Sequence, residues 1–395
     1  MKNISIMYEG TNCPFLIALH KKQNYIYGVN VYNNEVFYLD LTDRELHYCG
    51  RLPVLSAWKE KPVHNILIYQ DFCFLIPFWN NTNLFIYDCK RSLWKKVPLI
   101  ILHEIERSVR GEKIPGYYYG ACMYHDQLFM LPFGCRHLIK YNILTGEVSD
   151  CADFGNTLIK EDIVLFHKHE WINTTCIALS CLYSNHIVLF NLETNEMDIK
   201  TVGCDDYRFS TIIKYGEIFW IVVKNKLIFL QWNPDTGYVK EFKAFPRGCM
   251  IVNDRHCFDE SNIYLYSDAL YCFPAACNMA VKFDLKQEIA VEIQSLTYYC
   301  QDLRLDREQS TFDGGVRDGE KVYLHYQLDK ILEFDLRTES VQEYDRILRS
   351  AVSRKKRWID EFAHLLESIP LKSNDKLDKK VTGEEIYDTV SKFVL

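Results

Sequence analysis

The sequence lacks any uninterrupted apolar run of about 18 residues, the length that a helix needs to cross a bilayer. Its opening residues, MKNISIMYEG, also lack the apolar core of a secretory signal. The 15 cysteines fall mostly inside apolar runs, where Cys serves as a small hydrophobic side chain. Together these features predict a protein of the reducing cytoplasm with no membrane partner.

The sequence also has little concentrated positive charge. Its formal net charge is -7, and its one basic cluster is Arg354-Lys355-Lys356-Arg357. Proteins that bind DNA or RNA usually carry a basic stripe that meets the phosphates. We therefore expect no nucleic-acid partner, and we interpret the basic cluster as the solvated face of a helix.

Motifs that carry common chemistries are missing. There is no glycine-rich phosphate loop, no GxSxG nucleophile elbow and no CxxC pair. His167 and His169 could share one face of a strand, but no third metal ligand accompanies them. Acidic loop residues such as Asp268 lack the spacing of a calcium loop and are interpreted as solvated charges. We expect neither a metal nor another cofactor.

Residues that favour strands are abundant. The chain has 395 residues, of which 26 are Tyr and 23 are Phe, with only 17 Gly and 11 Pro. Aromatic residues are enriched in strands. A chain of this length exceeds one ordinary core, so it predicts either two domains or one large repeat domain.

A strand-rich segment recurs along the chain, most clearly as HLIKYNILTGEV at residues 137–148. In each copy an apolar run ends in an Asp or Asn, which we call the anchor. The anchors are Asp40, Asp88, Asn142, Asn191, Asn233, Asp284 and Asp335. They lie 42 to 54 residues apart, which is typical of propeller blades. The anchor side chain can accept an N–H two residues on, and the following Thr-Gly or Thr-Asn supplies a left-handed position.

Apolar runs upstream of each anchor complete a blade. In the third copy YYYGACMY, QLFMLPF and HLIKYN follow one another with short turns between them. Such runs form an antiparallel meander. The sequence therefore predicts an all-β fold, a seven-bladed β-propeller of four-stranded antiparallel blades over residues 1–349. Two β-sandwiches would not explain seven copies.

The segments YNILTGEV, FNLETNEM and FDLRTESV, each preceded by a hairpin, resemble the kelch-type repeat of β-propellers over about residues 10–345. Three departures stand beside the resemblance. Second strands end in Pro, at Pro77, Pro132 and Pro274. The kelch Gly pair is clear only at Gly314-Gly315, and the usual Trp of the fourth strand only at Trp94. A WD40-like propeller is the alternative, which we disfavour because Gly-His and Trp-Asp pairs do not occur at matching places.

Residues 350–395 depart from the repeat. Trp358, Phe362 and Leu365 fall on one stripe at helical spacing, so a C-terminal α-helical tail is expected. The tail either packs on the propeller or docks a partner protein. Ring closure has two possible forms. The early run ISIMYEG pairs into the last blade, or the seventh copy supplies its own four strands.

Long and dissimilar connections between blades share one end of the blades with the loops after the second strands, opposite the Thr-Gly turns. Variable loops on a rigid scaffold usually carry binding, and first strands line the channel. These positions give the candidate ligand-binding residues Trp79, Tyr119, Arg136, Arg208, Asn278, Asp313 and Arg317. Aromatic, Arg and Asn side chains suit a peptide, a sugar or an acidic group.

Fold alone does not give function, because propellers host both binding proteins and enzymes. Our first hypothesis is a cytoplasmic binding module that recognises a protein, peptide or carbohydrate at the end with the long loops. The alternative is a kelch-like sugar epimerase or lyase, with a Tyr, Arg and Asp cluster at the channel mouth for acid–base work. We favour binding; no catalytic residue and no oligomeric state is indicated.

Overall fold

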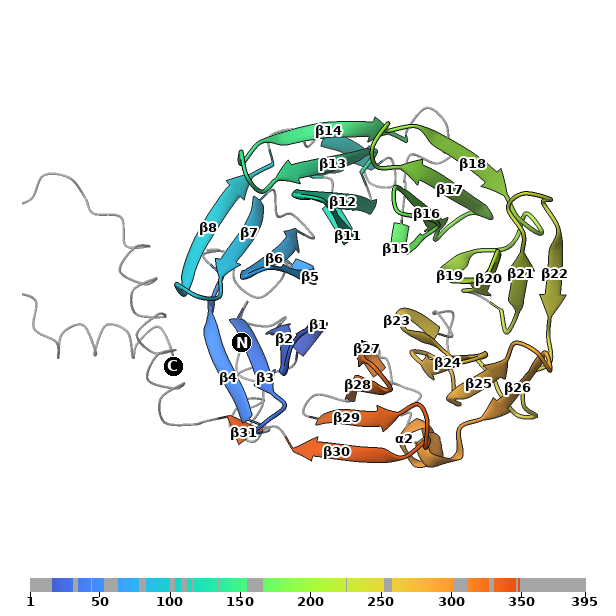
Figure 1. Cartoon of the computed structure of the whole chain (residues 1–395). Helices are drawn as coiled ribbons and strands as arrows, with labels where there is room; N and C mark the ends of the chain where they lie inside the picture. The colour runs from blue at the N-terminus through green and yellow to red at the C-terminus, as the bar shows by residue number, and fades with distance from the viewer. Residues whose placement is uncertain are drawn as a thin grey trace, which may run out of the picture.

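The computed structural model describes residues 16–30, 35–43, 45–52, 63–77, 83–99, 104–107, 112–115, 117–133, 135–154, 166–224, 226–251, 258–301, 312–326, 330–345 and 347–348. In these residues the chain forms seven successive antiparallel sheets, the blades, arranged round one axis (Figure 1). Each blade contains four consecutive strands, with the first strand nearest the axis and the fourth outermost.

The first three blades have the following strands. Blade 1 contains β1 (Leu16–Lys22), β2 (Tyr25–Asn30), β3 (Glu35–Asp40) and β4 (Glu45–Arg51). Blade 2 contains β5 (Val63–Tyr69), β6 (Phe72–Pro77), β7 (Asn83–Asp88) and β8 (Leu93–Pro98). Blade 3 contains β11 (Tyr117–Tyr124), β12 (Gln127–Phe133), β13 (His137–Asn142) and β14 (Val148–Asp153).

Four further blades complete the ring. Blade 4 contains β15 (Phe166–Trp171), β16 (Cys176–Cys181), β17 (His186–Asn191) and β18 (Met197–Thr201). Blade 5 contains β19 (Phe209–Tyr215), β20 (Ile218–Val223), β21 (Phe229–Trp232) and β22 (Val239–Phe242). Blade 6 contains β23 (Phe258–Tyr266), β24 (Ala269–Pro274), β25 (Val281–Asp284) and β26 (Ile289–Glu292). Blade 7 contains β27 (Phe312–Asp318), β28 (Lys321–Tyr326), β29 (Lys330–Asp335) and β30 (Val341–Asp345).

Two of the long connections predicted as loops contain secondary structure. A hairpin of β9 (Glu104–Arg107) and β10 (Glu112–Pro115) lies between blades 2 and 3. The short helices η2 (Gln294–Leu296) and α2 (Thr297–Gln301) follow blade 6. No helix in the described ranges is long and apolar enough to cross a membrane. The predicted seven-bladed, four-stranded propeller is confirmed, and the predicted helical tail at 350–395 lies outside the described residues.

Ring closure can be followed only through the described residues of blade 7 and blade 1. The sheet of blade 7 is built from its own four consecutive strands, as one of the two expected arrangements requires, and β27 lies beside β1. The run ISIMYEG lies outside the described residues. A further short strand, β31 (Ile347–Leu348), pairs in parallel with β4 on the outer edge of blade 1. The chain therefore returns to blade 1 after completing blade 7.

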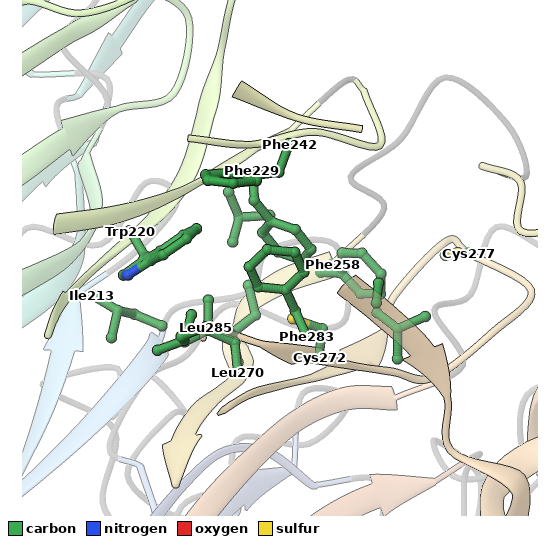
Figure 2. Packing of buried hydrophobic residues seen from close by; sticks show 14 residues of the cluster. Ile213, Trp220, Phe229, Phe242, Phe258, Leu270, Cys272, Cys277, Phe283 and Leu285 are labelled. Atoms are coloured by element: carbon green, nitrogen blue, oxygen red, sulfur yellow. The ribbon is translucent and has the colours of Figure 1, made fainter. Parts of the chain in front are cut away.

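The core lies between blades, where aromatic rings of neighbouring sheets meet. Trp220 and Phe229 of blade 5 pack on Phe283 of blade 6, and all three side chains are buried (Figure 2). Comparable buried clusters join the other blades around the ring. Because each blade presents one apolar face to each neighbour, burial between sheets is the main stabilising contribution.

The anchors act as the sequence predicts. Asn142 Oδ1 accepts the backbone N–H groups of Leu144 and Thr145 at 2.9 and 3.0 Å, and Gly146 takes a φ of 76°. Similar side-chain turns are made by the other anchors, Asp40, Asp88, Asn191, Asn233, Asp284 and Asp335. The recurring segment is thus a third strand, its closing turn and the start of the fourth strand.

Replacing Asn142 with Ala should lower the free energy of unfolding by about 1 kcal/mol, because two turn N–H groups lose their acceptor. Urea denaturation measures this loss. Asn142→Asp is the matched control, since it keeps the acceptor that four other blades use. Equal losses in both variants would show that the side-chain oxygen does not hold the turn.

Every first strand carries a register shift, which is often a β-bulge. In blade 3 the shift lies between Tyr118 and Gly120, and in blade 7 between Phe312 and Gly315. The other five first strands shift at matching places, near the end where the chain enters from the preceding blade. A bulge interrupts the regular alternation of side chains between the two faces of a sheet. Side chains at these positions therefore point in other directions than those in the rest of the strand.

Candidate functional site

The blades give the propeller two different faces. We call "turn face" the end that holds the first-to-second and third-to-fourth strand turns. We call "loop face" the end that holds the second-to-third strand loops and the connections between blades. Of the predicted site residues, Arg136 and Asn278 follow second strands, Arg208 immediately precedes a first strand, and Tyr119 lies in a bulge; all four are at the loop face. Binding by these residues stays a prediction.

The remaining predicted residues are placed differently. The backbone of Asp313 lies in the bulge of β27 at the loop face, and Trp79 lies outside the described residues. Arg317 lies at the turn face, where Nε donates to the carbonyl of Gly319 at 2.7 Å and Nη1 donates to the carbonyl of Leu265. Arg317 therefore joins blades 6 and 7 far from the other predicted residues.

Arg136 has a partner within its own blade. Its Nε and Nη2 donate to the two carboxylate oxygens of Asp153 at 3.1 and 2.8 Å. Next to it, His137 Nδ1 lies 2.6 Å from Asp150 Oδ2. The forked geometry of the guanidinium is matched by a carboxylate, so Arg136 ties the start of β13 to the end of β14.

Asn278 and Tyr119 also have contacts with neighbouring loop-face residues. Asn278 Oδ1 accepts the N–H of Met250 at 2.8 Å, and Nδ2 donates to the carbonyl of Gly248 at 3.0 Å. Asn278 thereby clamps the connection between blades 5 and 6. The Tyr119 and Phe133 rings lie with centroids 4.9 Å apart and are tilted by 31°, so Tyr119 packs against a ring of its own blade.

Blades 4 and 5 bring cations and aromatic rings together at the loop face. We call "blade 4–5 patch" the residues Tyr183, Tyr207, Arg208, Lys224 and Lys226. Lys224 Nζ lies 4.8 Å from the centroid of Tyr183, and Lys226 Nζ lies 4.9 Å from that of Tyr207. The Lys224 N–H donates to the carbonyl of Arg208 at 2.6 Å, which places these cations side by side. Tyr183 is 56% exposed, so the patch opens to solvent.

Arg208 has unused hydrogen-bonding capacity within the patch. Nη1 donates to the carbonyls of Asp205 and Tyr207 at 2.9 and 2.7 Å. Among the described residues, no carboxylate forms an ion pair with Arg208. The nearby carboxylate of Asp206 is bonded to Lys226, which chiefly lowers the pKa of Asp206, and the charge of Arg208 adds to this effect. The guanidinium thus remains able to donate a fork to an acidic ligand.

Tyr207 forms the rigid base of the patch. Its hydroxyl donates to Glu241 Oε1 at 2.5 Å, and burial together with this bond raises the pKa of Tyr207 well above its usual value. Gly203 permits the position of the ring. A Cβ at Gly203 would lie 2.8 Å from Tyr207 Cδ2, and the φ of 68° also favours glycine. Of the patch, the sequence pattern indicates only Arg208, because the other side chains come from separate loops of two blades.

At the turn face, Asp268 keeps a side chain that is 42% exposed, but it is also bonded to two other side chains. Tyr215 at the end of β19 donates to Asp268, and Lys286 of blade 6 is bonded to the same carboxylate. These donors, chiefly Lys286, hold the pKa of Asp268 below its usual value. Asp268 therefore links blade 5 to blade 6.

The same link recurs between other blades. Glu320 accepts from Tyr266 at 2.9 Å and pairs with Arg337 at 3.5 Å, while Asp71 pairs with Lys22 and Lys90 at 3.2 and 2.5 Å. A sequence signal for these links exists. The triplet of Tyr, any residue and an acid recurs at 69–71, 124–126, 215–217 and 266–268. Asp71 and Asp268 supply the acid of a link and Tyr215 and Tyr266 supply the hydroxyl, whereas Glu320 lies outside the triplets.

Three side chains in blade 1 are arranged as a metal site would require. Ligand atoms of Asp40, Asp43 and His47 lie within 4.8 Å of one another. Two ordinary contacts already account for this arrangement. Asp40 is the anchor of its turn, and Asp43 Oδ2 lies 3.5 Å from His47 Nε2. The group is partly exposed at the turn face, where acidic residues often occur without an ion.

Comparisons with known proteins show the fold of this chain and do not show its family or activity. No family model and no curated protein matches the sequence. Among solved structures, virginiamycin B lyase from Staphylococcus aureus is similar with 12% identity and a TM-score of 0.56, over 82% of this chain and 94% of that one. YCF48, described as bound to D1 peptide, is similar with 8% identity and a TM-score of 0.55, over 84% and 93%.

Sqt1 from Saccharomyces cerevisiae is also similar, with 11% identity and a TM-score of 0.55 over 85% of this chain and 86% of that one. At such identities these similarities establish a β-propeller and carry no activity across. A lyase and a peptide-bound protein share the fold, so the function must be argued from the site of this chain.

Proposed function

We propose that this chain is a binding module whose blade 4–5 patch receives an acidic group of a peptide or protein partner. The observation that carries the proposal is Arg208, which is held in place through Nη1 and keeps further donors for a ligand. A carboxylate or phosphate is the group that matches a guanidinium fork.

The aromatic side chains of the patch suit the rest of such a ligand. Tyr183 is exposed beside Lys224, so an apolar side chain next to the acidic group could pack on the ring. Tyrosine and arginine together are the residue types that most often carry binding energy in protein interfaces. YCF48, which has the same fold, is described as bound to a peptide, which supports a peptide ligand for a propeller.

The repeat family and the cellular compartment are also part of this proposal. The anchored turns favour a divergent kelch-type repeat, and most described cysteines are buried as small apolar side chains, which favours a reducing cytoplasm. A carbohydrate ligand has less support, since the patch is richer in charge than in paired hydroxyl and amide groups. The epimerase or lyase alternative also has less support, because Arg317 and Tyr119 lie at opposite faces of the propeller.

Arg208→Ala should weaken binding of an acidic peptide roughly tenfold to hundredfold, because a charged hydrogen-bond donor is lost. The peptide is obtained by selecting a displayed random library on the wild-type chain, and its affinity is measured by fluorescence anisotropy. Affinity should also fall as salt is raised.

Arg91→Ala is the matched control, since Arg91 is 77% exposed at the turn face and lies 3.9 Å from Asp88. This variant should bind as the wild type does. Selection of peptides without acidic residues, or equal weakening in both variants, would refute the proposed site.

A further inference from the structure

Two loop-face segments that are distant in sequence are held together in blade 6. One is the connection 243–251 from blade 5, and the other is the loop 275–280 after β24. Asn278 bonds to Gly248 and Met250, and Ile251 forms an isolated antiparallel bridge with Cys277. These contacts place two cysteines of different loops opposite each other.

The sulfur atoms of this pair are close. Cys249 Sγ lies 3.4 Å from Cys277 Sγ, although the residues are 28 apart in sequence. Cys277 is fully buried, whereas Cys249 is partly exposed, so one thiol of the pair is accessible from solvent. A disulfide needs a separation of about 2.05 Å, which requires only a small approach of two side chains on loops.

Cys277 is also chemically unlike several buried thiols of the propeller. Burial raises the pKa of Cys122 and of Cys135 to about 12. The hydrogen bond from Cys249, helped by backbone N–H groups, instead lowers the pKa of Cys277. The thiolate is the reactive form in disulfide exchange. The backbone N–H groups, which include those of Met250 and Met279, are the part of this environment that still favours the Cys277 thiolate once Cys249 has reacted.

We propose that Cys249 and Cys277 are a reversible disulfide site that latches the connection between blades 5 and 6 onto the loop after β24. The oxidant is a small-molecule disulfide. The Cys249 thiolate attacks one of its sulfurs, forms a mixed disulfide and displaces the first small thiolate. The Cys277 thiolate then attacks Cys249 Sγ and displaces the second. The two cysteine protons pass to the two departing thiolates, so two cysteines are oxidised and one small disulfide is reduced. This inference does not rest on the proposed function.

Oxidation of the full-length chain in buffers of reduced and oxidised glutathione tests the site. After alkylation and digestion, peptide mapping should find a Cys249–Cys277 linkage while the other cysteines are alkylated as thiols, and dithiothreitol should reverse it. Limited trypsin cleavage after Arg247, an exposed residue of the latched connection, should slow about tenfold on oxidation, because cleavage follows local opening.

Cys249→Ser should abolish both the linkage and the protection of Arg247, and it replaces the partly exposed member of the pair so that folding is little affected. Cys204→Ser, which removes an exposed loop-face thiol outside the pair, is the matched control and should leave both effects intact. A stable glutathione adduct on Cys249 without linkage would overturn the proposal. Oxidation of Cys204 while the pair stays reduced would overturn it as well.

Discussion

Replacing Phe283 with Ala should lower the free energy of unfolding by about 3–5 kcal/mol, the range measured when large buried aromatic side chains are removed. Phe283 of blade 6 is fully buried. Its ring centroid lies 5.3 Å from that of Trp220, 4.6 Å from that of Phe229 and 5.7 Å from that of Phe242, all of blade 5 (Figure 2). Two hydrogen-bonded sheets form the walls of the resulting cavity, so they cannot close it by a small shift.

Guanidinium denaturation followed by tryptophan fluorescence measures this loss, since Trp220 lies in the same cluster. Phe283→Leu keeps much of the volume and should cost about 1–1.5 kcal/mol. Leu144→Ala changes a side chain that is 76% exposed on a turn and should be close to neutral. A loss below about 1 kcal/mol for Phe283→Ala would show that the two blades repack.

Packing between blades also couples the loop face to the core. Phe283 belongs to the same buried cluster as Cys277, and Cys249 packs against that cluster. The pair proposed as a disulfide site is therefore fixed by the interface between blades 5 and 6.

The fold was predictable because its strongest signal is local. An anchor such as Asn142 bonds to N–H groups two and three residues away, so the whole turn can be read from consecutive letters. Seven repetitions of that turn at nearly constant spacing then require a ring of similar sheets. No long-range information was needed to reach the number of blades or their strand order.

The bulges of the first strands weaken the pattern by which a strand is recognised in sequence. A strand is recognised by alternating apolar and polar residues, and an inserted residue reverses that alternation partway along. In blade 7 the shift lies between Phe312 and Gly315, so the two parts of β27 follow different alternations. Tyr119 lies in the corresponding irregularity of blade 3.

Site residues were harder to predict because their partners depend on how distant segments meet. Sequence placed Arg136 on a loop but did not pair it with Asp153, which lies across the outer strands of the same blade. It also missed Asp268, whose donors come from two blades. Residue type indicates what a side chain can bind, whereas the register between blades decides whether another side chain already binds it.

His20 is a titratable group that the sequence did not single out. It lies on β1 near the axis, partly buried, beside β5 of blade 2. Burial lowers the pKa of its imidazole from 6.5 to about 4, and a hydrogen bond with the backbone of Ile66 offsets part of this effect. The folded chain therefore favours the neutral ring where the unfolded chain would already be protonated.

Acidification should accordingly destabilise the wild-type chain through His20. Between pH 6.5 and 4 the unfolded state binds more protons at this ring, so stability falls as the pH drops through that window. The full effect corresponds to about 3 kcal/mol, and partial exposure reduces the expected loss to about 2 kcal/mol. Above pH 6.5 the His20 ring is neutral in both the folded and the unfolded chain, so the folded chain keeps its full stability there.

His20→Gln removes this titration and keeps a polar side chain of similar length. The variant should be less stable than the wild type at pH 7.5, because the local packing is altered, but the difference should shrink by about 2 kcal/mol at pH 4.5. Urea denaturation of both chains at each pH measures the difference, in which the titration of all shared carboxylates cancels. A difference that stays constant from pH 7.5 to pH 4.5 would show that the His20 ring is protonated as readily in the folded chain as in the unfolded one.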